Sequence, residues 1–309
     1  MPYRNLDGSI IDKSFADLLK WKLRFAGREP PAIVAPDTPA PFVDNDGSLL
    51  AAASRPALTW IGHASFLIQL GGKSILVDPI LSERIVAIKR LVAPGLAWSA
   101  LPRIDAVLVT HNHRDHMDAP TLARLGDDVR FIVPAGLGQW FRKEGRSDVV
   151  ELDWYSHCDL DSVRITFVPS HHWSMRTPFD RNESLWGGYV VEDGTHRVYH
   201  SGDTGYFDGF SEIASKVGPI DCAMLPIGAY EPRWFMRSQH MNPDDAVKAF
   251  VDLRARRFVA MHWGTFKLTD EPTGEPPLVT KELWHSTRLE EERLLIPSVG
   301  ETIWLGDLG

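Results

Sequence analysis

The chain has 309 residues, of which 44% are hydrophobic and 24% are charged, and its formal net charge is -8. This length and apolar content suffice for a large buried core, so a disordered chain is excluded, and the negative charge disfavours a nucleic-acid-binding protein. Two cysteines, Cys158 and Cys222, are too few for a disulfide scaffold or a thiolate metal cage, and two free thiols fit a reducing compartment.

The first 48 residues differ in character from the rest of the chain. Their start is polar, so no signal peptide is expected, and no apolar stretch of the sequence is long enough to span a membrane. Residues 14–25 mix large apolar residues with basic ones, which is typical of a helix on a membrane surface and equally of a helix docked on its own core. Residues 28–48 are rich in proline, alanine and aspartate and predict an extended connector. We expect a cytoplasmic protein, with peripheral membrane contact left open, in which segment 1–48 packs on or flanks a domain at 49–309.

Short apolar runs separated by turn residues follow the connector. The runs at 57–62, 65–70 and 74–79 predict strands, and the Gly-Gly-Lys between the last two predicts a hairpin turn. Residues 85–98 are apolar but contain a lysine and an arginine, so they predict either a mobile, lipid-facing lid or a helix packed on the core. The nearly all-apolar run at 104–110 predicts a strand buried on both faces.

Strands and helices are expected to alternate in the rest of the chain. Strands are predicted at 130–133, 163–168, 185–192, 197–201, 221–225, 257–261 and 301–305. Helices are predicted at 119–126, 136–144, 209–216 and 243–254. Asn242 followed by Pro243 marks the start of the last helix. This order favours sheets covered by helices in a single domain.

Polar side chains with metal-binding groups gather at the ends of four predicted strands. The stretch THNHRDHMD at 110–118 follows the buried strand, and the strand period of two points the first two of its histidines to one side. The other three strand ends carry the histidine pair of VPSHHW, the aspartate of SGDTG and the histidine of AMHWG. Nitrogen and oxygen ligands suit divalent ions such as zinc, and so many of them suit two ions bridged by an aspartate, as in two-metal hydrolysis. A single histidine at a strand end is usually structural, but four such ends together predict a metal centre.

The HxHxDH spacing at 111–116 resembles that of the metallo-β-lactamase fold superfamily. Within it, segments between residues 58 and 280, most specifically IGAYEPRWFM at 227–236, resemble N-acylphosphatidylethanolamine-hydrolysing phospholipase D and its bacterial relatives. The resemblance implies an α+β fold, a four-layer αββα sandwich, with two Zn²⁺ ions between the sheets; Mn²⁺ and Fe²⁺ stay open as the native metals. It also implies the ligand set: one ion on His111, His113 and His172, the other on Asp115, His116 and His262, with Asp203 as the bridge.

Several neighbours of this ligand set carry expectations of their own. His171 stands at the position of a glutamine in the family, which suggests a supporting or pocket-facing residue, and His63 is expected to be a satisfied polar residue near the core. Asp78 and Asp118 either accept hydrogen bonds from ligand histidines or are ordinary turn residues. Arg114 replaces a tyrosine that close relatives often carry, which changes the polarity of the pocket. Four aromatic residues either line an acyl-chain channel or belong to the core: Trp173, Trp186, Trp234 and Phe235.

The function implied by the resemblance is that of a binuclear zinc metallohydrolase in lipid metabolism. It would be a phosphodiesterase of the phospholipase D type that cleaves N-acylphosphatidylethanolamine or a related lipid with a hydroxide bridging the metals. Asp115 would orient the hydroxide, and Gln239 and His240 would lie on the substrate side. The alternatives are a lactonase or other small-molecule hydrolase on the same two metals, and a catalytically silent metal-binding protein. No nucleic-acid partner is expected, and a homodimer stays open.

Overall fold

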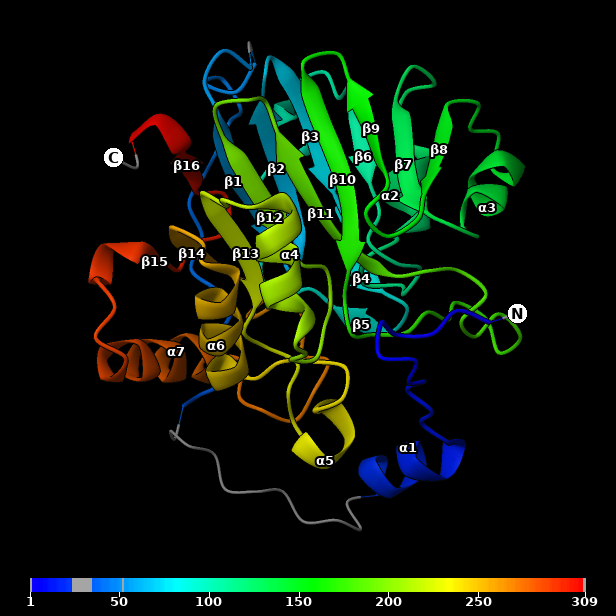
Figure 1. Cartoon of the computed structure of the whole chain (residues 1–309), viewed down its shortest axis with the longest axis vertical. Coiled ribbons are helices and arrows are strands. Elements are labelled where there is room, and N and C mark those ends of the chain that lie inside the picture. Colours follow the sequence, from blue (N-terminus) through cyan, green and yellow to red (C-terminus); the bar gives the residue numbers. More distant parts are fainter. Residues whose placement is uncertain (1, 24–34, 52, 308–309) are drawn as a thin grey trace.

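The computed structural model describes residues 2–23, 35–51 and 53–307, so the end of the predicted helix 14–25 and the start of the connector 28–48 lie outside the described residues. Two seven-stranded sheets face each other, and helices cover their outer faces (Figure 1). The predicted four-layer αββα sandwich is therefore confirmed. Among the described residues, no helix is long and apolar enough to cross a membrane.

The first sheet contains β1 (Ala57–Gly62), β2 (Ser65–Leu70), β3 (Lys73–Val77), β6 (Ala106–Leu108), β7 (Arg130–Pro134), β8 (Val149–Leu152) and β16 (Thr302–Trp304). Its spatial order is β16-β1-β2-β3-β6-β7-β8. The strands from β16 to β3 pair antiparallel, and those from β3 to β8 pair parallel. Consequently β6 ends at the edge of the sandwich where the other parallel strands end.

The second sheet contains β9 (His157–Leu160), β10 (Val163–Pro169), β11 (Gly187–Glu192), β12 (Arg197–His200), β13 (Cys222–Pro226), β14 (Arg257–Met261) and β15 (Leu294–Leu295), in the order β15-β14-β13-β12-β11-β10-β9. Its strands from β12 to β15 pair parallel, and those from β9 to β12 pair antiparallel. The segments that follow β6, β10, β12 and β14 meet at one edge of the sandwich, as is usual for sites in layered α/β folds.

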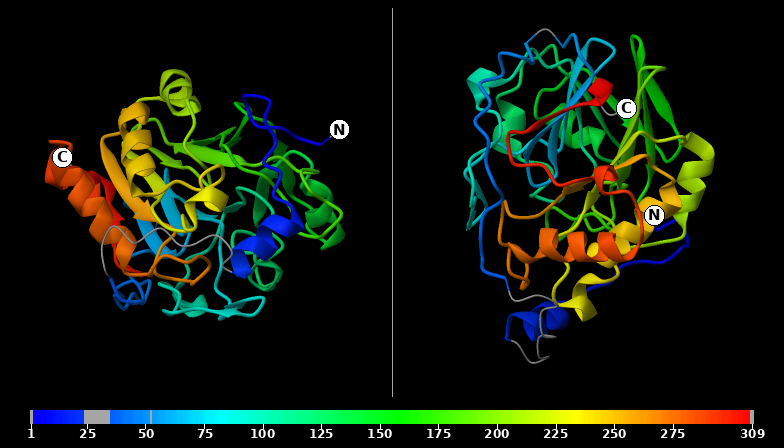
Figure 2. Two further views of the ribbon diagram at one scale, coloured as in Figure 1. Left: turned by 90° about the horizontal axis from the view of Figure 1, so that it is seen from below. Right: turned by 90° about the vertical axis from the view of Figure 1, so that its left-hand side faces the viewer.

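The helices are α1 (Phe15–Lys22), α2 (Ala119–Ala123), α3 (Gly138–Lys143), α4 (Gly209–Val217), α5 (Arg233–Met236), α6 (Pro243–Leu253) and α7 (Glu275–Ser286). The outer face of the first sheet is covered by α2 and α3, and that of the second by α4, α6 and α7 (Figures 1 and 2). The predicted start of α6 is confirmed, because Asn242 and Asp245 form a reciprocal capping box and Pro243 opens the helix. The four-residue α5 and the twelve-residue α7 were not predicted, nor were β8, β9 and β15.

Alternation along the strands separates two cores. In β3, Ile75 and Val77 point between the sheets, whereas Leu76 points to the layer of α2 and α3. In β6, Leu108 belongs to the inner core and Val107 to the outer one. Both faces of these strands are buried, as the nearly all-apolar run predicted.

Residues 85–98 do not form the helix that was one of their two predicted structures. They contain the second strand of a small hairpin, β4 (Arg84–Ile85) and β5 (Ile88–Lys89), followed by an irregular segment. Val86 at the hairpin turn is 73% exposed, whereas Arg90 is buried and donates to the carbonyls of Ile80 and Val92. The hairpin therefore presents apolar residues to solvent while one arginine anchors it to the core.

Candidate metal centre

The loop after β6 brings the first group of predicted ligands together with the loop after β10. His111 Nε2 lies 2.9 Å from His113 Nδ1, and His172 Nε2 lies 3.2 Å from the same atom. One ligand atom from each of the three histidines lies within 4.8 Å of the others. The structure thus assembles the three residues that the resemblance assigns to one ion.

The second group forms next to the first, with Asp203 in contact with both. One ligand atom each of Asp115, His116 and His262 lies within 4.8 Å of the others. Asp203 Oδ1 lies 3.0 Å from His262 Nε2, and Asp203 Oδ2 lies 3.1 Å from His116 Nε2 and 4.0 Å from His172 Nε2. A carboxylate between two groups of nitrogen ligands is placed where a bridging ligand would be needed.

The close approach of Asp203 depends on the glycine before it. Gly202 has a φ of +60°, and a Cβ added there would lie 2.5 Å from the carbonyl oxygen of Gly187. A larger residue would therefore push the Asp203 loop away from the sheet.

The donor atoms of this cluster fit divalent metal ions. Nε2 of His116, Nε2 of His262 and Oδ1 of Asp203 are buried, and apart from their contacts within the cluster none of them has a hydrogen-bond partner among the described residues. Buried polar atoms are normally paired, so a group of unpaired ligand atoms aimed at one another calls for ions between them. Burial also lowers the pKa of His113 to about 4, which keeps its imidazole in the neutral form that binds metal.

Asp78 orients two of the predicted ligands from behind. It is fully buried and accepts a 2.7 Å hydrogen bond from His116 Nδ1. It also accepts from the backbone N–H and the hydroxyl of Thr110, and the Thr110 hydroxyl oxygen lies 3.0 Å from His111 Nδ1. The prediction that Asp78 supports a ligand histidine is confirmed, and this contact leaves Nε2 of His116 facing the centre.

The same prediction was wrong for Asp118, and the alternative of a turn residue holds. Its carboxylate accepts 2.5 Å hydrogen bonds from the hydroxyls of Ser82 and Thr121, and no contact with a histidine is found among the described residues. Asp118 precedes α2 and ties the start of this helix to the segment after β3. Its role is to join two loops of the first sheet.

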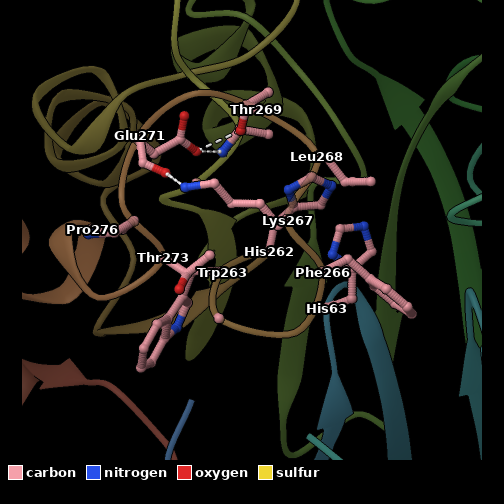
Figure 3. Close-up of a pocket in the computed structure, with 13 residues that line it drawn as sticks. His63, His262, Trp263, Phe266, Lys267, Leu268, Thr269, Glu271, Thr273 and Pro276 are labelled. Carbon is pink, nitrogen blue, oxygen red and sulfur yellow. Dashed lines mark hydrogen bonds between the residues drawn. The ribbon is translucent and has the colours of Figure 1, made fainter. Parts of the chain in front are cut away.

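His63, which the sequence analysis left outside the ligand set, lies inside the centre. Its Nε2 lies 3.2 Å from Asp115 Oδ2, and its ring centroid lies 3.8 Å from that of His262. One ligand atom of His63 is within 4.8 Å of those of Asp115, His116 and His262. Burial and the neighbouring His262 lower the pKa of His63 to about 3, so it is neutral at physiological pH. Figure 3 shows His63 and His262 side by side at one end of a pocket that continues to Lys267 and Glu271.

The backbone around the centre is held in unusual conformations. Three non-glycine residues that touch the site have positive φ: His63 at +57°, Asp78 at +44° and His262 at +64°. Such conformations cost about 1–3 kcal/mol each and cluster at functional sites, where surrounding contacts impose them. Two backbone contacts supply part of that support here, because the His63 N–H donates to Thr265 and the His262 N–H donates to the His63 carbonyl.

The two residues expected on the substrate side lie at the rim of the cluster. His240 Nδ1 is buried 3.7 Å from Asp203 Oδ2 and has no hydrogen-bond partner among the described residues. The Gln239 carbonyl accepts a hydrogen bond from His172 Nδ1, and its side-chain oxygen is buried and likewise unpaired within the described part of the chain. Burial lowers the pKa of His240 to about 4. His240 thus offers a ring nitrogen beside the predicted ions, whereas Gln239 contacts the cluster through its backbone carbonyl.

His171 and Arg114 point away from the cluster. His171 Nδ1 donates to the Ser238 carbonyl, and its Nε2 lies 3.1 Å from Ser9 Oγ, so it faces a surface pocket rather than the centre. His171 therefore faces a separate surface pocket, and the described contacts of its ring do not support a ligand. Arg114 is exposed and donates to the carbonyl of Arg176.

The four aromatic candidates divide between core and surface. Trp186 is buried with 1% exposure and belongs to the core, and Phe235 packs against Trp21 of α1 with ring centroids 5.1 Å apart. Trp173 makes an edge contact with His113 at 4.6 Å, and Trp234 is 37% exposed. Only Trp173 touches a predicted ligand, so an acyl-chain channel built from all four aromatics is wrong.

Comparison with known proteins agrees with this geometry. The sequence model described as the β-lactamase superfamily domain matches residues 73–263. An N-acyl-phosphatidylethanolamine-hydrolyzing phospholipase D of Caenorhabditis elegans is 36% identical over 266 residues, which cover 80% of this chain and 74% of that protein. A metal-dependent hydrolase of Nitratidesulfovibrio vulgaris is 34% identical over 228 residues, covering 70% of this chain and 83% of that protein. Among solved structures, a metallo hydrolase of the archaeon Ignicoccus hospitalis has the same fold, with a TM-score of 0.64 and 23% identity over 81% of this chain and 98% of that chain.

Proposed function

The chain belongs to the β-lactamase superfamily as a metal-dependent hydrolase, and we propose that it is a phosphodiesterase of the phospholipase D type with two zinc ions. The proposed substrate is N-acylphosphatidylethanolamine or a related glycerophospholipid. The observation that carries the proposal is the cluster of seven histidine and aspartate ligands, five of them buried. Four-fifths of this chain is also similar in sequence to the phospholipase D of Caenorhabditis elegans.

Each ion would be held by one of the two ligand groups. His111, His113 and His172 would bind the first ion, Asp115, His116 and His262 would bind the second, and Asp203 would bridge them. Bound ions would lower the pKa of a water molecule toward about 7 and neutralise charge that develops on the phosphoryl oxygens. His63 would offer a fourth ligand atom on the side of the second ion, and its contact with Asp115 Oδ2 orients that carboxylate.

The remaining roles follow from where the side chains stand. Asp115 is partly exposed, with 20% side-chain exposure, so it would orient the attacking water at the open side of the cluster. His240 is placed to hydrogen-bond a phosphoryl oxygen through its unpaired ring nitrogen, with Gln239 beside it. The water oxygen would bond to phosphorus, and the bond from phosphorus to the ethanolamine oxygen would break. The products would be phosphatidic acid and an N-acylethanolamine.

We expect the zinc-loaded protein to release both products from N-acylphosphatidylethanolamine in detergent micelles. A chelator should abolish the reaction, because the ligand atoms alone cannot activate water, and His111→Ala should abolish it as well. Mass spectrometry of reactions run in ¹⁸O-water should find the label in phosphatidic acid, since attack is at phosphorus. Label in the N-acylethanolamine would contradict the proposed bond cleavage. No product from protein shown to hold two ions would overturn the lipid substrate, and turnover of a lactone by the same protein would favour the alternative hydrolase.

A second part of the proposal concerns contact with the lipid surface. Trp21 of α1 packs on Phe235 and Met236 of α5, and α5 lies just before Gln239 and His240 (Figure 1). This docking leaves Leu18, Leu19 and Leu23 with 39%, 45% and 54% exposure. Helix α1 is therefore docked on its own protein, which is one of the two predicted alternatives, and it also exposes apolar residues to solvent.

Basic side chains accompany these exposed apolar residues. Lys20 Nζ lies 4.8 Å from the ring centre of Trp234, and Lys22 Nζ lies 3.8 Å from that of Trp21. Exposed leucines interleaved with lysines are the features of a surface that lies on anionic lipids. We propose that α1 and α5 rest on the membrane from which the lipid substrate enters.

Reversing the charge of both Lys20 and Lys22 to glutamate is expected to weaken binding to vesicles of phosphatidylcholine and phosphatidylserine by more than about 30-fold, since the loss of each lysine near such a surface costs about 1 kcal/mol and the new glutamates add repulsion. Co-sedimentation measures this affinity. The matched control reverses Lys143 and Lys281, exposed lysines of α3 and α7, and should keep native affinity. Equal losses in both pairs would show that only net charge matters, and the proposed surface would then be wrong.

A further inference from the structure

The first residues of the chain lie across the loop that carries His172. We call residues 3–13 the N-terminal strap. Its Tyr3 N–H donates to the carbonyl of Asn182, and Arg181 donates to the carbonyls of Ile11 and Lys13. The β-lactamase superfamily domain match covers residues 73–263, so the strap lies outside it while its partners Arg181 and Asn182 lie within it.

Asn5 is the point at which the strap reaches the metal centre. Its side chain is 3% exposed, and its Oδ1 accepts a 3.0 Å hydrogen bond from the backbone N–H of His172. The same oxygen accepts a 3.0 Å hydrogen bond from Trp186 Nε1. One amide oxygen therefore ties the peptide of a predicted ligand to a fully buried tryptophan of the core.

Two contacts fix the orientation of His172. The backbone contact with Asn5 holds its peptide, and the hydrogen bond from its Nδ1 to the Gln239 carbonyl sets the direction of its ring. Removing the Asn5 oxygen would leave the buried His172 N–H unpaired, which is unfavourable unless the loop moves. Either response displaces the ring nitrogen that faces the first ion.

The other end of the strap is connected to a second predicted ligand, His113. Arg181, which holds the carbonyls of Ile11 and Lys13, stacks on Trp173 with its guanidinium 4.7 Å from the ring centre. Trp173 in turn makes its edge contact with His113. Between them, the two ends of the strap support two of the three predicted ligands of one ion.

We propose that the N-terminal strap is part of the metal centre and that Asn5 is a positioning residue for His172. The inference rests on the proposed metal-binding role of His111, His113 and His172. Loss of the strap contacts should therefore weaken the binding of one ion more than that of the other. The strap contacts the residues that position His113 and His172, whereas the described contacts of Asp115, His116 and His262 do not include the strap.

In the full-length protein, Asn5→Ala is expected to lower the affinity for one of the two zinc ions by 10- to 100-fold, which is the range seen when a hydrogen-bond partner of a metal ligand is removed. The affinity for the other ion should stay within about threefold of native. Chelator competition measures both affinities, and the absorption of the cobalt-substituted protein reports the ligand geometry independently of turnover. Asn5→Asp keeps an oxygen acceptor and should restore binding. Arg4→Ala is the matched control, since this exposed neighbour bonds only to Gly8 within the strap.

Native affinity for both ions in folded Asn5→Ala would overturn the proposal, and so would an equal loss of both. Should Asn5→Ala fail to fold, Arg181→Gln removes strap contacts from outside the centre and is expected to lower the affinity for the same ion. Unchanged zinc affinity in Arg181→Gln would contradict the proposed role of the strap. The outcome is separate from the substrate. Native protein that binds two ions without cleaving N-acylphosphatidylethanolamine would remove the proposed function and leave the role of the strap to be judged by these affinities.

Discussion

Asp203→Asn is expected to lower kcat/KM for the phospholipid by about 10³-fold or more, or about 4 kcal/mol of transition-state stabilisation. The reason is the position of Asp203, which lies between His116 and His262 and also approaches His172. Asparagine keeps the shape of the side chain but removes the negative charge that would join two cations. Steady-state kinetics measures the loss, and elemental analysis of the purified variant should find less than two ions per chain.

The control for this variant is an aspartate in a turn away from the metal centre. Asp193 accepts from the backbone N–H groups of Thr195 and His196 in the turn between β11 and β12, so Asp193→Asn should retain both ions and native turnover. A fully active Asp203→Asn with two bound ions would exclude Asp203 as a bridging ligand. It would also require a different account of why its Oδ1 is buried without a hydrogen-bond partner among the described residues.

The sandwich was predictable because its strands are patterned at short range. Runs such as those of β3 and β6 bury both faces and therefore appear as uninterrupted apolar segments bounded by turn residues. The start of helix α6 is marked in the sequence by Asn242 and Pro243. By contrast, α7 begins with Glu275, Pro276 and Pro277, and two consecutive prolines normally indicate a loop although the first turn of a helix accepts them.

The ligand set was visible for a related reason. The HxHxDH motif is local, and the other ligands stand where strands end, so spacing and strand assignment suffice to gather them. His63 carries no such spacing. It enters the centre because a register shift between Trp60 and Gly62 and a positive φ turn its side chain toward Asp115. Asn5 meets His172 across 167 residues of sequence, and no local pattern encodes that contact.

Asp78 and Asp118 show the limit of local reasoning most directly. Both are buried aspartates in loops next to the predicted ligands, and the same supporting role was open to each. Tertiary structure separates them, because β3 and β6 are parallel neighbours and place Asp78 beside Thr110 and His116. Asp118 instead meets the hydroxyls of Ser82 and Thr121. The two residues therefore provide a matched pair for experiment.

Asp78→Ala is expected to destabilise the metal-free protein by about 3–5 kcal/mol, because it removes a fully buried carboxylate whose donors are left without an acceptor. The orphaned donors are the backbone N–H and hydroxyl of Thr110 and Nδ1 of His116. Urea unfolding monitored by tryptophan fluorescence measures the free energy. Since His116 and, through Thr110, His111 lose their orientation, zinc should also bind 10- to 100-fold more weakly.

Asp118→Ala separates stability from metal binding. The substitution removes the carboxylate that accepts hydrogen bonds from two hydroxyls near α2, so the free energy of unfolding should fall by about 1–3 kcal/mol. The zinc affinity should stay within about threefold of native, because Asp118 is not seen to contact a ligand histidine among the described residues. Asp78→Asn, which retains one oxygen acceptor, should fall between native and Asp78→Ala in both measurements. If Asp78→Ala and Asp118→Ala weakened zinc equally, the defect would follow from general loosening of the fold. If only Asp78→Ala weakens it, the hydrogen bond to His116 is what holds that imidazole toward the metal.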